Sequence, residues 1–150
     1  MTRAFLPLLH QSDDARLVNI SSVYGLIAPP GNTAYVASKF AVRGFSESLR
    51  HDLEGSTIGV TLVHPGGVAT SIARNAKLPA SVDPAEAEVR RKTFEALLRM
   101  KPEEAGEIIV RGVENRRARV LVGADAKRMA LIERLMPVNY WKLIGRSLRR

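Results

Sequence analysis

The run RLVNISSVYGLIAPPGNTAYVASKFAVRGFSESLRHDLEGSTIGVTLVH, residues 16–64, carries the pattern from which the architecture of this chain follows. Its first residues, 16–21, form a short apolar run that predicts a buried strand. A loop rich in Pro and Gly leads into a long helix predicted over 33–53, which Gly55 is placed to end. Residues 58–64 are rich in β-branched side chains and predict a second strand. A strand, a helix and a strand in this order are typical of a βαβ unit with parallel strands.

The chain on both sides of this run repeats the alternation of helix and strand. Residues 71–82 follow neither period and are expected to be irregular. Asp83 and Pro84 are typical of the N-cap and the first residue of a helix. Outside the first run we predict one strand and five helices, namely strand 118–123 and helices 2–10, 84–100, from Pro102 onward, 125–136 and 138–148. Three strands that alternate with helices predict an α/β fold with a parallel sheet flanked by helices.

The composition is that of one ordinary globular domain, with 150 residues of which 45% are hydrophobic and 25% charged. No apolar run approaches the ~18 residues that a membrane-spanning helix needs. The absence of Cys excludes disulfides, thiol catalysis and Cys-based zinc sites, and it is compatible with the cytoplasmic location that we predict. His10 and His51 lack a ligand pattern, so no metal site is predicted.

The formal net charge of +8 is concentrated in residues 111–150, which carry 11 of the 23 Lys and Arg but only 3 of the 15 Asp and Glu. Such a segment can contact nucleic acid, an anionic membrane or an acidic partner. A solvated basic face is the interpretation that we favour. Because the sequence has neither a helix-turn-helix signature nor an aromatic platform on a strand, we predict no binding of nucleic acid.

Small and polar residues follow the first two predicted strands. Ser21 and Ser22 come directly after the first strand, and the segment from Pro65 to Thr70 comes after the second. In open parallel sheets, ligands bind beyond the carboxyl ends of the strands. These residues are therefore candidates for a binding site.

Tyr35 and Lys39 stand four residues apart on the predicted helix, so their side chains share one face. A phenol is a poor acid or base at neutral pH, but a nearby ammonium favours its phenolate form. The pair could therefore exchange a proton with an alcohol or ketone oxygen, which the Ser22 hydroxyl could hold. The alternatives are a surface pair along the helix for Tyr35 and Lys39, and a turn or capping hydroxyl for Ser22.

Two segments, NISSVYGLIAPPGNTAYVASKFAVRGFSESLRHDL and VTLVHPGGVATS, resemble the second half of a short-chain dehydrogenase/reductase. The resemblance implies a Rossmann-type fold and hydride transfer between NAD or NADP and a small carbonyl or alcohol substrate. In that family Tyr35 matches the general acid and base, and Lys39 matches the residue that binds the nicotinamide ribose. Ser22 matches the serine that positions the substrate oxygen.

The resemblance also extends to the segments around this triad. It implies that helix 33–53 packs against a second subunit and that region 71–100 is a variable substrate lid. Apart from the resemblance, the alternation of apolar and basic residues at the end of the chain predicts a basic C-terminal arm over about 124–150. We interpret this arm as covering the lid or a subunit interface, with peripheral binding to anionic lipid as the alternative. The cofactor-binding residues implied by the family are Tyr35, Lys39, Pro65, Gly66, Val68 and Thr70.

The family's first half has no counterpart in this sequence. No Gly-x-x-x-Gly-x-Gly and no Asn-Asn-Ala-Gly occurs. We therefore expect an incomplete fold without its N-terminal βαβ half, in which strand 16–21 is an exposed edge. Our hypothesis is a truncated sequence or an internal start at Met1, and a chain that binds dinucleotide poorly and aggregates. The alternative function is a non-catalytic module that pairs with a partner through helix 33–53.

Overall fold

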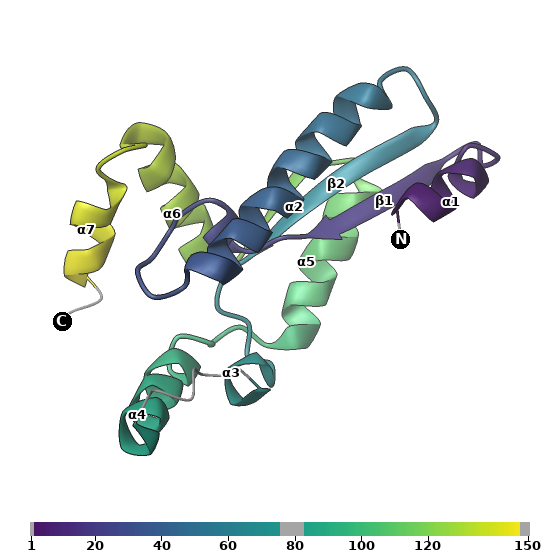
Figure 1. Cartoon of the computed structure of the whole chain (residues 1–150). Helices are drawn as coiled ribbons and strands as arrows, with labels where there is room; N and C mark the ends of the chain where they lie inside the picture. Colours follow the sequence, from purple (N-terminus) through teal and green to yellow (C-terminus); the bar gives the residue numbers. More distant parts are fainter. Residues whose placement is uncertain (1, 76–82, 148–150) are drawn as a thin grey trace.

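Three parallel strands form the centre of the structure, a computed structural model that describes residues 2–75 and 83–147. They form one sheet in the order β1-β2-β3 (Figure 1). The strands are β1 (Ala15–Ile20), β2 (Ile58–Pro65) and β3 (Arg119–Val122). Each lies within a residue or so of its predicted range, and the α/β class with a parallel sheet is confirmed.

The helices lie on both faces of the sheet and at its ends (Figure 1). Their bounds are α1 (Thr2–Leu9), the 3-10 helix η1 (Val23–Gly25), α2 (Thr33–Asp52), α3 (Ile72–Asn75), α4 (Pro84–Glu95), α5 (Pro102–Glu114), α6 (Ala124–Leu135) and α7 (Tyr140–Ser147). None of the helices within these described ranges is long and apolar enough to cross a membrane.

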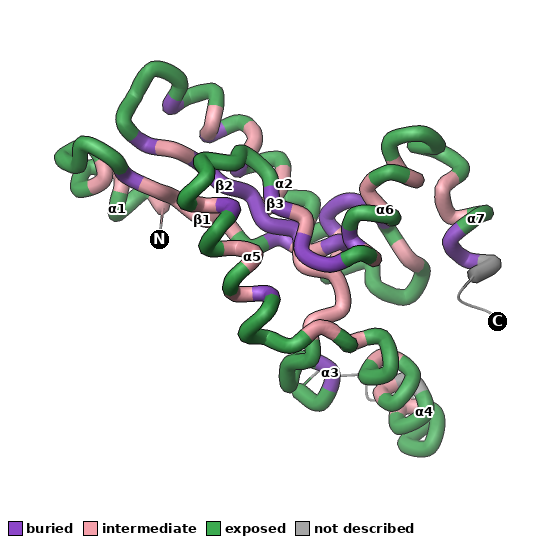
Figure 2. The backbone as a smooth tube through the Cα atoms, turned by 180° about the vertical axis from the view of Figure 1, so that it is seen from behind, coloured by how far each residue is buried: buried purple, intermediate pink, exposed green. Residues whose placement is uncertain are grey.

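Strand β2 lies in the middle of the sheet and is mostly buried (Figure 2). Its side chains alternate between two apolar layers. Ile58 and Val60 pack against Leu49 and Leu53 at the end of α2. On the other face, Val63 packs in a cluster with residues of β3 and α5. Because successive residues of a strand point to opposite faces, a strand covered on both sides reads as a continuous apolar run.

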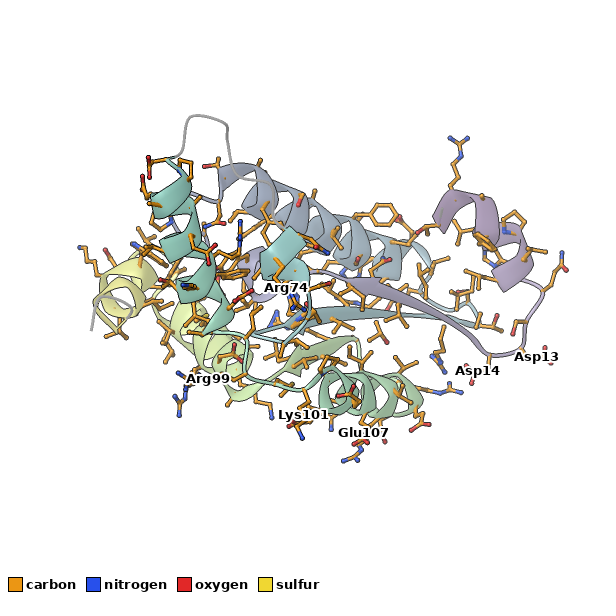
Figure 3. All side chains as sticks on the ribbon, turned by 90° about the horizontal axis from the view of Figure 1, so that it is seen from below. Asp13, Asp14, Arg74, Arg99, Lys101 and Glu107 are labelled. Atoms are coloured by element: carbon orange, nitrogen blue, oxygen red, sulfur yellow. The ribbon has the colours of Figure 1, made fainter. Side chains whose placement is uncertain are left out.

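Strand β1 lies at one edge of the sheet, as expected. Its exposure is smaller than we expected, because Leu17 packs on the α2 layer and Val18 on the α5 layer, and both are half-buried. Ile20 is 47% exposed. The turn before β1 lies at the amino end of this strand, away from the carboxyl ends, and contains Asp14 (Figure 3). Asp14 accepts a hydrogen bond from Arg116 at 3.1 Å.

Two expectations about the segment after β2 are wrong. Residues 72–75 form the short helix α3, although an irregular segment was predicted. The helix predicted to reach Met100 ends at Glu95, because Met100 instead forms a parallel bridge with Val68. The N-cap prediction is confirmed, since Asp83 accepts hydrogen bonds from the N–H groups of Ala85 and Glu86. Parts of the predicted elements at 76–82 and 148–150 lie outside the described residues.

Candidate active site

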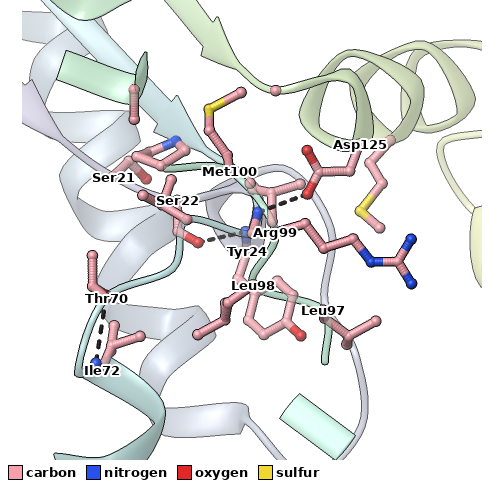
Figure 4. Close-up of a pocket in the computed structure, with 18 of the residues that line it drawn as sticks. Ser21, Ser22, Tyr24, Thr70, Ile72, Leu97, Leu98, Arg99, Met100 and Asp125 are labelled. Carbon is pink, nitrogen blue, oxygen red and sulfur yellow. Dashed lines mark hydrogen bonds between the residues drawn. The ribbon is translucent and has the colours of Figure 1, made fainter. Parts of the chain in front are cut away.

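A cavity of about 950 Å³ lies where the three parallel strands end (Figure 4). The turns after β1, β2 and β3 all contribute to its wall, because parallel strands of one sheet end at the same edge. Segment 97–100 and Trp141 of α7 complete the wall. The structure brings all the predicted site residues to this cavity, namely Ser22, Tyr35, Lys39, Pro65, Gly66, Val68 and Thr70.

Tyr35 and Lys39 lie one turn apart at the start of α2. The Lys39 ammonium lies 5.5 Å from the centre of the Tyr35 ring, which is within the range of a cation–π contact. The same ammonium donates a hydrogen bond to the carbonyl oxygen of Ile20 at 3.4 Å. Tyr35 is 37% exposed, so a ligand in the cavity can reach it.

Two serines hold the turn after β1. The Ser22 hydroxyl oxygen accepts a hydrogen bond from the backbone N–H of Tyr24 at 3.1 Å and thereby caps η1 (Figure 4). The Ser21 hydroxyl donates to the carbonyl oxygen of Lys39 at 2.9 Å and ties the turn to α2. Ser22 is therefore a capping residue, but among the described residues its own O–H donates to no group. That O–H is free to donate to a ligand.

Gly25 allows this turn to approach α2 closely. A Cβ at this position would lie 2.3 Å from the Ser21 hydroxyl oxygen and 2.9 Å from the carbonyl oxygen of Lys39. The Arg43 guanidinium donates to the carbonyl oxygen of Gly25 at 3.3 Å. Gly25 was not predicted as a site residue, because a glycine in a loop is common whether or not the loop is crowded.

Tyr24 places a second phenol beside Tyr35. The two rings meet edge to face, with their centres 6.0 Å apart and their planes at 80°. Burial, and then the negative charge that Tyr35 would carry, raise the pKa of Tyr24 above its usual value. Tyr24 is therefore a neutral phenol at neutral pH. Of the two tyrosines, Tyr35 has the cation of Lys39 beside its ring.

His64 of β2 supports the turn after β1 through a contact with the backbone of Ser22. It is fully buried near the end of β2, and its Nδ1 lies 2.8 Å from the carbonyl oxygen of Ser22. Burial lowers the pKa of His64, the hydrogen bond to Ser22 opposes that shift, and the charges of Arg119 and Arg43 add to the lowering. The ring is therefore neutral at neutral pH, with its proton on Nδ1. His64 does not line the cavity, and it holds the backbone of Ser22 in place.

Asp125, in the first turn of α6, supports the turn after β2. Its carboxylate accepts a hydrogen bond from the backbone N–H of Gly67 at 2.7 Å (Figure 4). A Cβ on Gly66 would lie 2.2 Å from this carboxylate, so the turn and Asp125 need a glycine to approach so closely. Asp125 was not predicted as a site residue, because an acid in the first turn of a helix is common and does not by itself indicate a distant partner.

The segment before α5 also packs on this turn. The carbonyl oxygen of Gly67 accepts hydrogen bonds from the N–H groups of Arg99 and Met100, both at 3.0 Å. A Cβ on Gly67 would lie 2.0 Å from the carbonyl oxygen of Leu97. These contacts bring part of the predicted lid, residues 97–100, to the wall of the cavity (Figure 4).

The sequence matches a family model and curated proteins that are described as oxidoreductases. A family model described as short chain dehydrogenase matches residues 1–80. The SadH protein of Mycobacterium tuberculosis is 44% identical over 147 residues, which cover 96% of this chain and 52% of that protein. The chain thus spans about half the length of this curated relative.

The structure is similar to solved structures of short-chain dehydrogenases. A short chain dehydrogenase/reductase from Burkholderia phymatum, solved in complex with NAD, matches with a TM-score of 0.76 and 25% identity over 89% of this chain and 52% of its own. A short-chain dehydrogenase from Streptomyces avermitilis matches with a TM-score of 0.72 and 26% identity over 97% of this chain and 57% of its own. The expected Rossmann-type fold is confirmed, and this chain covers part of it.

Proposed function

The chain belongs to the short chain dehydrogenase family, and we propose that it carries the substrate-reacting half of an NAD- or NADP-dependent oxidoreductase. The reaction would transfer a hydride between the nicotinamide and the carbon of a small carbonyl or alcohol substrate. The observation that carries this proposal is the meeting of Ser22, Tyr35 and Lys39 at one cavity beyond the strand ends. The three residues come from two elements, β1 with its turn and α2.

Tyr35 would exchange the proton. When a ketone is reduced, its oxygen takes a proton from the Tyr35 hydroxyl, and a phenolate remains. The Lys39 ammonium, 5.5 Å from the ring centre, would stabilise that negative charge. In the reverse direction the phenolate takes the proton of the alcohol. Tyr24 suits this role less, because its raised pKa disfavours the phenolate.

Ser22 would hold the reacting oxygen. Its hydroxyl oxygen already accepts the N–H of Tyr24, which orients the group and leaves the O–H to donate. A donor placed in advance at an oxygen that gains negative charge lowers the barrier without reorganisation. His64 fixes the carbonyl of the same residue, so both sides of Ser22 are held.

The described residues fit the nicotinamide end of the cofactor, which supplies or accepts the hydride when it is bound. Lys39 and Tyr35 offer polar groups for the ribose, and Pro65, Gly66, Val68 and Thr70 line the same cavity. NAD and NADP differ only at the adenosine ribose, so these residues suit both. Because the sequence contains no Gly-x-x-x-Gly-x-Gly loop for the pyrophosphate, we expect weak binding of dinucleotide by the 150-residue chain alone.

The test is turnover of a panel of secondary alcohols and ketones with NAD(H) and NADP(H), by this chain and by any longer product that the same reading frame encodes. In the active form, Tyr35→Phe is expected to lower kcat by about 10²- to 10⁴-fold, because it removes the exchangeable proton. Binding of NADH, followed by fluorescence, should change little. Full activity of Tyr35→Phe would exclude the proposed role of this residue.

A second candidate function is a non-catalytic module that acts through subunit pairing. It is favoured by the outer face of α2, where Phe40 and Phe45 are 39% and 52% exposed. The same face would pair two subunits of the enzyme, so both functions predict a homo-oligomer. The variant Tyr35→Phe distinguishes them, because the enzyme loses turnover in this variant whereas the module keeps its subunit pairing. The variant Phe45→Glu should abolish the pairing.

A further inference from the structure

The C-terminal pair of helices, α6 and α7, lies at one end of the molecule (Figures 1 and 2). Its inner face is well packed. Ile144 is buried against Val23, Leu26 and Ile27, and the Tyr140 hydroxyl accepts a hydrogen bond from the N–H of Ala28 at 3.0 Å. The pair therefore covers the segment that follows Ser22, and its orientation is fixed by these contacts.

The outer face of the pair is apolar and exposed. Leu131 and Leu135 are 57% and 71% exposed, and their four-residue spacing puts them on one side of α6. Met136 and Val138, in the turn that follows α6, are 38% and 86% exposed, and Leu143 of α7 is 50% exposed. Single exposed leucines are ordinary, but several large apolar side chains exposed on neighbouring turns indicate an interaction surface.

Cations border these side chains. Lys127, Arg128 and Arg134 lie on the same side of α6 as Leu131, and Lys142 lies on α7, all exposed. Within the described residues none of the four forms an ion pair. The acids of these helices, Asp125 and Glu133, are half-buried, and the Asp125 carboxylate accepts the hydrogen bond from the Gly67 N–H. The exposed face thus offers apolar side chains and positive charge.

We propose that this outer face of α6 and α7 docks on the surface of an anionic lipid membrane. At such a surface the leucines and valine would enter the boundary between headgroups and acyl chains, while the lysines and arginines would meet lipid phosphates. The 3.6-residue spacing puts both kinds of group on one side of the helix, as this mode of binding requires. The proposal does not depend on dehydrogenase activity.

Two other occupants suit this face less well. In a symmetric pair of chains the same patch faces itself, so the four cations would meet the same cations of the second copy. A nucleic acid would match the cations, but its phosphates would leave the exposed leucines without an apolar partner. A bilayer is the surface that presents negative charge and an apolar layer within a few ångströms of each other.

Docking in this way would also bring the cavity close to the bilayer. Met129 of α6 and Trp141 of α7 line the cavity from the inner side of the same helices. A substrate that partitions into lipid would then have a short path to Tyr35.

Vesicle flotation of the whole 150-residue chain tests the proposal, because aggregated protein stays at the bottom of the gradient. We expect the chain to float with phosphatidylcholine vesicles that contain 30% phosphatidylserine and to stay behind with pure phosphatidylcholine. Leu135→Glu with Val138→Glu should abolish flotation. Lys127→Glu with Arg134→Glu should weaken binding by at least 25-fold, about fivefold for each cation lost. All four positions are exposed, so these variants should fold.

The matched control is Arg111→Glu with Arg117→Glu, which changes the net charge equally but lies in α5 and just before β3, away from α6 and α7. This variant should float like the parent chain. Three results would overturn the proposal. The first is that the chain floats equally well with neutral and with anionic vesicles, and the second is that it does not float with anionic vesicles. The third is that the control loses as much binding as Lys127→Glu with Arg134→Glu, which would mean that net charge alone drives binding. The oligomeric state of the parent chain and of Leu135→Glu with Val138→Glu is compared by light scattering. A change in this state would identify a second copy of the chain as the occupant and would also contradict the proposal.

Discussion

The turn after β1 and the turn after β2 face the same cavity, but they are held by different kinds of contact. The turn after β1 is held mostly by contacts that are close along the chain, from its own serines and from α2 at most eighteen residues away, and His64 of β2 adds one longer contact. The turn after β2 depends on Asp125, 58 residues further along the chain, and on segment 97–100. Ser22, Tyr35 and Lys39 therefore lie on a turn and a helix whose mutual contacts are mostly close along the chain, whereas the predicted cofactor wall depends on more distant segments.

The largest effect is expected from Gly67→Ala. The new Cβ would lie 2.0 Å from the carbonyl oxygen of Leu97, and backbone atoms cannot move aside as a side chain can. We expect a loss of about 3 kcal/mol or more in the free energy of unfolding, measured by urea titration.

Gly106→Ala in α5 is the matched control, because a Cβ there would meet nothing within 4 Å. It should stabilise the chain by about 0.5–1 kcal/mol, since alanine favours a helix over glycine. Equal effects of the two substitutions would contradict the close packing of the turn after β2.

Asp125→Ala comes next. It removes the acceptor of the Gly67 N–H, a hydrogen bond to a charged group that contributes about 1.5–3 kcal/mol. We expect unfolding at lower urea and faster hydrogen exchange at Gly67. Asp125→Asn keeps an acceptor oxygen and should lose less than half as much, so an equal loss in both would mean that the charge alone matters.

The pH dependence of stability should reveal His64. Its pKa in the folded chain is lowered by burial, so the unfolded chain takes up a proton near pH 6.5 while the folded chain resists it. The stabilisation is complete above pH 6.5 and is lost as the pH falls below it. Between pH 7 and 5 we therefore expect the free energy of unfolding to fall, measured by urea titration at each pH.

The variant His64→Asn retains an N–H that can donate to the carbonyl oxygen of Ser22 but no titratable ring. Its stability should change less over this range than that of the parent chain. The same slope in both chains would assign the pH dependence to other groups.

The smallest effect is expected from Ser21→Ala, which removes the hydrogen bond to the carbonyl oxygen of Lys39. A neutral hydrogen bond of this kind contributes about 1 kcal/mol. The turn after β1 has further support from Ser22 and His64, so the loss should stay below that of Asp125→Ala. A larger loss for Ser21→Ala would reverse the contrast between the two turns.

The predictions from sequence succeeded where a pattern lies within one element or between neighbours along the chain. The run 16–64 indicated β1, α2 and β2, and the four-residue spacing of Tyr35 and Lys39 placed both on one side of α2. The segment after β2 was predicted less well. The early end of α4 and the bridge between Val68 and Met100 follow from hydrogen bonds to Gly67, which lies outside that helix.

The sequence by itself determined the parallel sheet, the long helix and the place of Ser22, Tyr35 and Lys39, because hydrophobic periods and turn residues act over short distances along the chain. Only the tertiary structure decided that Asp125 supports Gly67, that His64 holds Ser22, and that α7 buries Ile144 while Leu143 stays exposed. Each of these joins residues from separate elements. Such contacts arise when the strands align and the elements pack, and no local period of the sequence encodes them.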